Sequence, residues 1–221
     1  SRGHRLLRRD RTRMALDAGP ISRLGILGGT FDPIHIAHLV IAEEARVMCR
    51  LDRVVFVPAR VSPLKLQEGT LFTTEERLEM VRLAIADQPF FEVSRLDLDR
   101  EGPSFTVETL RLLRALYPPS VGLFFVMGMD SLVNLHRWVR PDEIIRLARL
   151  VVISRPGYTP DLEALDRQVP GLAAATEMLL SLDIGISSTE LRRRIQQGLP
   201  IRYQVPAAVE AYIHARYPAQ R

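Results

Sequence analysis

The chain has 221 residues, 47% hydrophobic and 25% charged, an ordinary globular composition with room for one large domain or two small ones. No stretch approaches the roughly 18 consecutive apolar residues that a membrane span needs, and a single cysteine, Cys49, excludes an internal disulfide framework and a CxxC-type zinc site. The net charge of +4 is concentrated at the amino terminus, because residues 1–13 hold six Arg and one Asp and the remaining residues therefore sum to −1.

Residues 1–20 form a basic extension, and because its first 13 residues hold no apolar core we do not expect a secretory signal there. An arginine-rich tail is compatible with contact to nucleic acid or anionic lipid. We favour a disordered extension instead, or a start-site artefact with Met14 as the true first residue. We therefore expect a cytoplasmic protein with no membrane and no nucleic-acid partner.

Apolar runs and helical periodicity alternate along the rest of the chain. Buried strands are predicted over 24–28, 53–58, 90–94, 121–128, 150–154 and 178–183. Helices are predicted over 36–50, 76–87, 106–117, 142–148, 188–197 and 206–216, the second of them opened by a capping-box pattern of Thr73 and Glu76.

This alternation predicts an α/β fold with a parallel sheet covered by helices on both faces. The strand over 121–128 is the most hydrophobic and is expected at the centre of the sheet. No linker is visible after residue 20, so we expect a single domain over 21–221. Ligands of such folds bind at the carboxyl ends of the strands, so function is expected in the loops that follow residues 28, 58, 94 and 128.

The first of these loops reads GGTFDPIHIAH over 28–38. Gly28 and Gly29 are expected to let the backbone turn sharply and approach a ligand. His35 and His38 share one face at the start of a helix, where the helix dipole favours phosphate, so the pattern predicts a polyphosphate site. The segment matches neither GxGxxG nor a P-loop. Zinc binding by HxxH is disfavoured because no third ligand of suitable spacing follows.

GGTFDPIHIAH resembles the GGTFDPxHxGH signature of the nucleotidylyltransferase superfamily. Within it, the chain is similar to the bacterial nicotinate-nucleotide adenylyltransferases over almost its whole length. The segments that carry this likeness are PARVSPLK (58–65), ERLEM (76–80), REGPSFTVETL (100–110), MGMDSL (127–132), Trp138, RPGY (155–158) and ISSTELRRRI (186–195).

The resemblance implies a Rossmann-like fold with a doubly wound parallel sheet. It also implies an enzyme that joins ATP to nicotinate mononucleotide and releases pyrophosphate. The phosphate of the mononucleotide would attack the α-phosphorus in line, with no covalent enzyme intermediate, so catalysis would be positioning and electrostatic stabilisation. Mg²⁺ would arrive on the triphosphate, and no metal site of the protein's own is expected.

On the ATP side, the resemblance implies that His35 and His38 contact the phosphates and the transferring group, with Thr30 and Phe31 facing the nucleotides. Ala37 stands where the family has Gly, a mild departure. The remaining residues implied on this side are Gly128 beside the adenosine, Asp130 at a ribose hydroxyl and Arg155 near the adenine. For Asp130, the alternative is the N-cap of a helix, and the two roles are compatible.

ISSTELRRRI predicts a helix capped by Ser187, Ser188 or Thr189, with neighbouring N–H groups left for an anion. Arg192 follows Ser188 by one helical turn, and the resemblance implies that it grips the outer phosphates. The structural alternative is an ordinary capped helix with solvated arginines, which is how we interpret Arg193 and Arg194.

On the mononucleotide side, the resemblance implies that Lys65 contacts the phosphate, Thr106 the nicotinate carboxylate and Trp138 the pyridine ring. Leu64 replaces a family histidine, so one phosphate donor is missing, and Arg60 is a candidate substitute. The alternative for Trp138 is a place in the core, although the polar stretch around it favours partial exposure.

Three other functions stay open at this point. Nicotinamide mononucleotide or 4′-phosphopantetheine is an alternative acceptor, although pantetheine offers no ring for Trp138. A non-catalytic nucleotide or nucleic-acid binding module is less favoured. The oligomeric state, a homo-oligomer included, is open as well.

Overall fold

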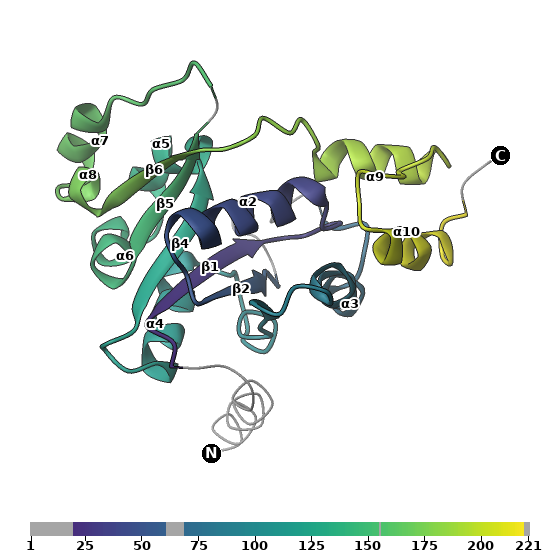
Figure 1. Ribbon diagram of the computed structural model, residues 1–221, viewed down its shortest axis with the longest axis horizontal. Helices are drawn as coiled ribbons and strands as arrows, with labels where there is room; N and C mark the ends of the chain where they lie inside the picture. The colour runs from purple at the N-terminus through teal and green to yellow at the C-terminus, as the bar shows by residue number, and fades with distance from the viewer. Residues whose placement is uncertain (1–19, 61–68, 155, 219–221) are drawn as a thin grey trace.

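The structure is a computed structural model that describes residues 20–60, 69–154 and 156–218. Its centre is a six-stranded parallel sheet in the order β3-β2-β1-β4-β5-β6 (Figure 1). The strands are β1 (Arg23–Gly29), β2 (Arg53–Pro58), β3 (Phe91–Val93), β4 (Gly122–Gly128), β5 (Arg149–Ser154) and β6 (Thr176–Leu180). This is the strand order of a doubly wound Rossmann fold, so the predicted single α/β domain with a central 121–128 strand is confirmed.

Helices cover both faces of the sheet, because successive side chains of each strand point to opposite faces and the apolar side chains on both faces must be buried. One face packs against α2 (Ile36–Met48), α3 (Thr74–Ile85), α9 (Ser188–Gln196) and α10 (Ala207–His214). The other packs against α4 (Thr106–Leu116), α5 (Met129–Val133), the 3₁₀ helix η2 (Leu135–Arg137), α6 (Pro141–Leu147), α7 (Leu162–Gln168) and α8 (Leu172–Ala175). Figure 1 shows α9 and α10 beyond the carboxyl end of β1.

Most predicted elements lie where expected, and the differences are local. The capping box of Thr73 and Glu76 is present at the start of α3. The sixth strand was predicted too late, because pairing with β5 joins Leu150 to Thr176 and Ser154 to Leu180. The short helices α5, α7 and α8 were not predicted, since four to seven residues carry little periodicity.

Two further features concern packing and membranes. Cys49 is buried, and burial raises the pKa of its thiol to about 11, as expected for a packing residue. No helix among the described residues is long and apolar enough to cross a lipid bilayer.

Candidate active site

A cavity of about 530 Å³ lies at the carboxyl ends of β1 and β2. Its walls come mainly from segments that are far apart in sequence: the ends of β1 and β2 with the residues that follow them, the residues around the start of α4, Phe125 of β4, and the residues around η2. The predicted site residues that line it are Gly28, Gly29, Thr30, Thr106 and Trp138. Five residues predicted from three separate motifs thus share one cavity.

The turn after β1 is made by Phe31 and not by the two glycines, contrary to the expectation. Phe31 is 2% exposed and adopts the left-handed conformation with φ 51°, whereas neither Gly28 nor Gly29 has a positive φ. A Cβ on Gly29 would lie 3.2 Å from the Phe31 ring, and a Cβ on Gly28 would make ordinary contacts of 3.9 Å with Phe125 and the carbonyl of Val57. Gly29 therefore makes room for the Phe31 ring, whereas the packing at Gly28 does not require a glycine.

His35 and His38 lie together at the start of α2, as predicted. Their rings stack with centroids 3.7 Å apart, and the backbone N–H of His35 donates to Nδ1 of His38 over 3.1 Å. Because Nδ1 of His38 accepts this bond, a neutral His38 carries its proton on Nε2. The Phe31 ring meets His38 edge-on at 5.1 Å, so the turn and the imidazole pair form one packed unit.

The N-terminus of α2 is less open than expected. The N–H of Ile36 donates to the carbonyl of Gln204 over 2.9 Å, and the N–H of His38 donates to the carbonyl of His35 over 3.0 Å. These two first-turn groups are therefore not free for phosphate. The imidazoles remain as the main donors that α2 presents to an anion.

Both imidazoles are neutral at pH 7 in this structure. Burial lowers the pKa of His35 to about 4. Burial, and then repulsion from His35, lower the pKa of His38 well below its ordinary value of 6.5. A bound polyphosphate would raise both values, because a nearby negative charge favours the protonated ring.

Helix α9 is fastened to the loop after β1. Ser187 caps it by accepting from the N–H of Glu190, which resolves the choice among the three hydroxyl residues. The Ser188 hydroxyl donates to the carbonyl of Pro33 over 3.0 Å. The Thr189 hydroxyl accepts from Arg192 over 3.3 Å. The predicted ATP segments 28–38 and 187–192 are thus in contact, although about 150 residues of chain separate them.

Arg192 and Asp32 make the strongest link between these segments. Arg192 Nη1 donates to the carbonyl of Asp32 over 2.9 Å and lies 3.7 Å from its carboxylate, which is 2% exposed. By contrast, Arg193 pairs with Glu190 on the exposed side of α9, as expected for a solvated residue.

At the other end of the cavity, Thr106 is the first residue of α4. No side chain caps this helix. The N–H of Glu108 donates to the carbonyl of Phe105 over 3.1 Å, so the first-turn N–H groups available to a ligand are those of Thr106 and Val107. Trp138 is half-buried and meets Phe125 edge-on at 6.3 Å, so its expected partial exposure is confirmed.

Residues of this wall that were missed are Ser104 and Asp97. Ser104 accepts from the N–H of Arg60 over 3.1 Å. The carboxyl of Asp97 accepts from the Thr109 hydroxyl over 2.8 Å and pairs with Arg100 at 3.1 Å, while burial raises its pKa. The i, i+3 spacing of Asp97 and Arg100 was the available signal.

Phe31, the histidine pair and the predicted residues of α9 do not line this cavity, and four further predicted residues, Gly128, Asp130, Lys65 and Arg155, lie apart from it or outside the described part of the chain. Gly128 is the N-cap of α5, so the alternative that Asp130 caps this helix is wrong; the Asp130 side chain is exposed in its first turn. A Cβ on Gly128 would meet nothing within 4 Å, which leaves space for a ligand. Lys65 and Arg155 lie outside the described residues.

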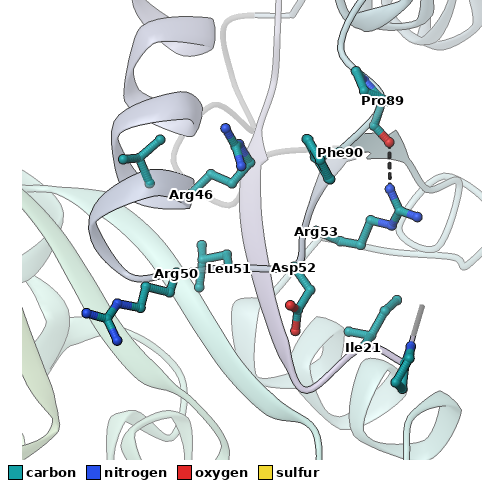
Figure 2. A pocket seen from close by; sticks show the side chains of 10 residues that line it. Ile21, Arg46, Arg50, Leu51, Asp52, Arg53, Pro89 and Phe90 are labelled. Atoms are coloured by element: carbon teal, nitrogen blue, oxygen red, sulfur yellow. Dashed lines mark hydrogen bonds between the residues drawn. The ribbon is translucent and has the colours of Figure 1, made fainter. Parts of the chain in front are cut away.

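A second cavity of about 830 Å³ lies at the opposite, amino-terminal end of the strands, among the residues that precede β1, β2 and β3 (Figure 2). Three of its four charged side chains already have partners: Arg46 is paired with Glu43, and Arg53 donates to the carbonyl of Pro89. The Asp52 carboxylate accepts from the backbone of Ser22. Size alone therefore does not make this cavity the site of chemistry.

Within residues 20–60, 69–154 and 156–218, no three His, Cys, Asp or Glu side chains lie together as a metal site. The imidazoles of His35 and His38 and the guanidinium of Arg192 suit phosphate oxygens better than a hard cation.

The chain is similar to proteins of one kind. Residues 26–194 match the family model described as cytidylyltransferase-like. A probable nicotinate-nucleotide adenylyltransferase of Roseiflexus sp. (strain RS-1) is 51% identical over 192 residues, 87% of this chain and 95% of that protein. A second, from Thermus thermophilus, is 46% identical over 191 residues, 86% and 96% of the two chains.

Solved structures have the same fold. The Plasmodium falciparum nicotinic acid mononucleotide adenylyltransferase complexed with NaAD superposes with a TM-score of 0.72 at 18% identity, over 90% of this chain and 98% of that one. The same enzyme complexed with APC gives a TM-score of 0.70. At this identity the likeness concerns the fold.

Proposed function

Because the chain belongs to the cytidylyltransferase-like superfamily and, within it, to the nicotinate-nucleotide adenylyltransferases, we infer that it transfers the adenylyl group of ATP to nicotinate mononucleotide, giving deamido-NAD and pyrophosphate in NAD biosynthesis. One observation of geometry carries this function further. The stacked His35 and His38 pack against Phe31, which directly follows the cavity-lining Thr30, and the same cavity is lined by Trp138 and by Thr106 at the start of α4.

The reaction needs no base from the protein. A phosphate oxygen of the mononucleotide is already ionised at neutral pH, and it attacks the α-phosphorus while the bond to the β-phosphate breaks. The rings of His35 and His38 suit this chemistry as hydrogen-bond donors, and protonation on phosphate binding would add positive charge. Arg192 is proposed to hold the outer phosphates that leave as pyrophosphate. Catalysis is then positioning and stabilisation of negative charge.

Mg²⁺ is the divalent ion we propose, bound to the triphosphate of ATP. It would neutralise negative charge at the phosphates. The phosphate oxygens of ATP, rather than side chains of the protein, would coordinate it. His35, His38 and Arg192 contribute donors and positive charge from the protein side. Lys65 is proposed for the phosphate of the mononucleotide.

The uncapped start of α4 supports nicotinate as the acceptor. First-turn N–H groups and the helix dipole favour a carboxylate over a neutral amide, and Thr106 adds a hydroxyl at the same place. Trp138 provides an apolar ring for the pyridine. A cytoplasmic location and the lack of a nucleic-acid partner stay predictions.

Pyrophosphate release from ATP and Mg²⁺ tests this function, with three acceptors supplied separately: nicotinate mononucleotide, nicotinamide mononucleotide and 4′-phosphopantetheine. We expect fast release with the acid mononucleotide alone. Release only with another acceptor would keep the fold and the ATP site but overturn the roles of Thr106 and Trp138. No release with any of them would favour a non-catalytic nucleotide-binding protein.

A further inference from the structure

Arg77, on the first turns of α3, is 1% exposed. Its guanidinium donates to two backbone carbonyls, Nη1 to that of Thr30 and Nη2 to that of Arg60 over 3.4 Å. Thr30 begins the loop after β1 and Arg60 lies in the loop after β2. One buried side chain therefore connects the two loops that follow the neighbouring strands β1 and β2, at the carboxyl ends of these strands.

This placement is costly for an arginine. Burial lowers the pKa of Arg77, opposed by the charge of Asp32. Among the described residues, Nε of Arg77 is buried without a hydrogen-bond partner. Burying a charged, incompletely bonded group opposes folding, and an apolar side chain of similar length would fill the space at lower cost. The two carbonyl contacts are thus what the guanidinium contributes at this position.

The contacts of Arg77 continue into the wall of the cavity. The N–H of Arg60 donates to the Ser104 hydroxyl, and Nη1 of Arg60 donates to the carbonyl of Arg100 over 2.9 Å. The N–H of Ala59 donates to the carbonyl of Gly29 over 2.8 Å. The backbone around Arg60 is therefore held by Arg77 on one side and by the segment before α4 on the other.

We propose that Arg77 is a positioning residue that sets the distance between the ATP loop after β1 and the mononucleotide loops around Arg60 and Ser104. This inference rests on the proposed adenylyl transfer. The planar guanidinium reaches both carbonyls from one rigid group, which a lysine ammonium does not reproduce. Because in-line attack depends strongly on the separation of the reacting atoms, loss of this brace lowers turnover more than it weakens binding of either substrate.

The test compares Arg77→Met and Arg77→Lys with the control Arg82→Met, steady-state kinetics being measured per folded protein with each substrate varied. Arg82 lies on the same helix, is half exposed and faces Glu79 at 3.6 Å. We expect kcat of Arg77→Met to fall by about 10- to 100-fold, with each KM changed by less than about threefold. Arg77→Lys should fall in between, and Arg82→Met should equal the wild type.

Each outcome of this test either supports or overturns the proposed role of Arg77. A folded Arg77→Met with wild-type kcat would overturn the proposal, and so would a loss confined to one KM. If Arg77→Met does not fold, Arg77→Lys decides: full turnover contradicts the need for a planar fork, and reduced kcat at unchanged KM supports it. An inactive wild type would instead refute the proposed function, a failure visible before any variant is made.

Discussion

The imidazole rings of His35 and His38 stack at 3.7 Å with their planes 26° apart. Two positively charged rings would repel each other at this distance. Burial already holds both rings neutral at pH 7. The pair is therefore uncharged at neutral pH, and a bound polyphosphate would favour its protonation.

The first prediction is a loss of stability in weak acid. Below pH 6.5 the unfolded chain binds a proton at His35, and the folded chain does so only near pH 4, so the free energy of unfolding falls as the pH drops through this window. The His35 contribution amounts to up to about 3 kcal/mol. Urea unfolding between pH 7 and 4 measures it, with His35→Gln as the variant that flattens the slope. An equal slope in both proteins would contradict the inference that His35 is neutral in the folded protein at pH 7.

The second prediction concerns the Nε2 atom of His38. His38→Asn keeps an acceptor near the position of Nδ1, which receives the His35 N–H, but removes the donor at Nε2. We expect kcat to fall by about 10²- to 10³-fold with a modest change in ATP affinity. Thermal unfolding checks that the variant folds, and near-normal turnover would remove His38 from the mechanism.

The third prediction separates two neighbouring arginines of α9. Arg192 faces the ATP loop, whereas Arg193 pairs with Glu190 at the surface. Arg192→Gln should raise the KM for ATP by about tenfold or more, since it loses a charge-assisted hydrogen bond. The KM for the mononucleotide should stay unchanged. Arg193→Gln is the matched control, and equal effects of the two variants would place the phosphates elsewhere.

The fourth prediction addresses the aromatic wall. Trp138→Ala should raise the KM for the mononucleotide by about tenfold, because ring stacking and apolar contact are lost. Trp138→Phe should restore most of it. If only the KM for ATP moved, the stacking assignment would be wrong.

Much of the fold follows from local sequence. β2 was predicted with its observed bounds, because an uninterrupted apolar run ends at Pro58. β6 was misplaced because its position is set by pairing with β5, and exposed Leu180 and Leu182 extended the apparent run. Pairing between distant strands leaves no mark in the hydropathy of either.

The candidate site divides in the same way. The segments 28–38 and 187–192 belong to recognisable motifs, so the contacts that Ser188 and Arg192 make with the loop after β1 were predictable. Arg77 was not, because its partners are backbone carbonyls in two distant loops. The left-handed turn at Phe31 was hidden by two adjacent glycines, to which the local rules assign such a turn.

The most direct test of the account is a competition for one labelled adenylyl group. ATP labelled at the α-phosphorus is incubated with Mg²⁺, the full-length protein and equal amounts of nicotinate and nicotinamide mononucleotide, and the labelled products are separated by chromatography. The account predicts that the label enters deamido-NAD in large excess over NAD, and that Thr106→Val reduces this excess. Label found mainly in NAD, or in neither dinucleotide, would contradict it.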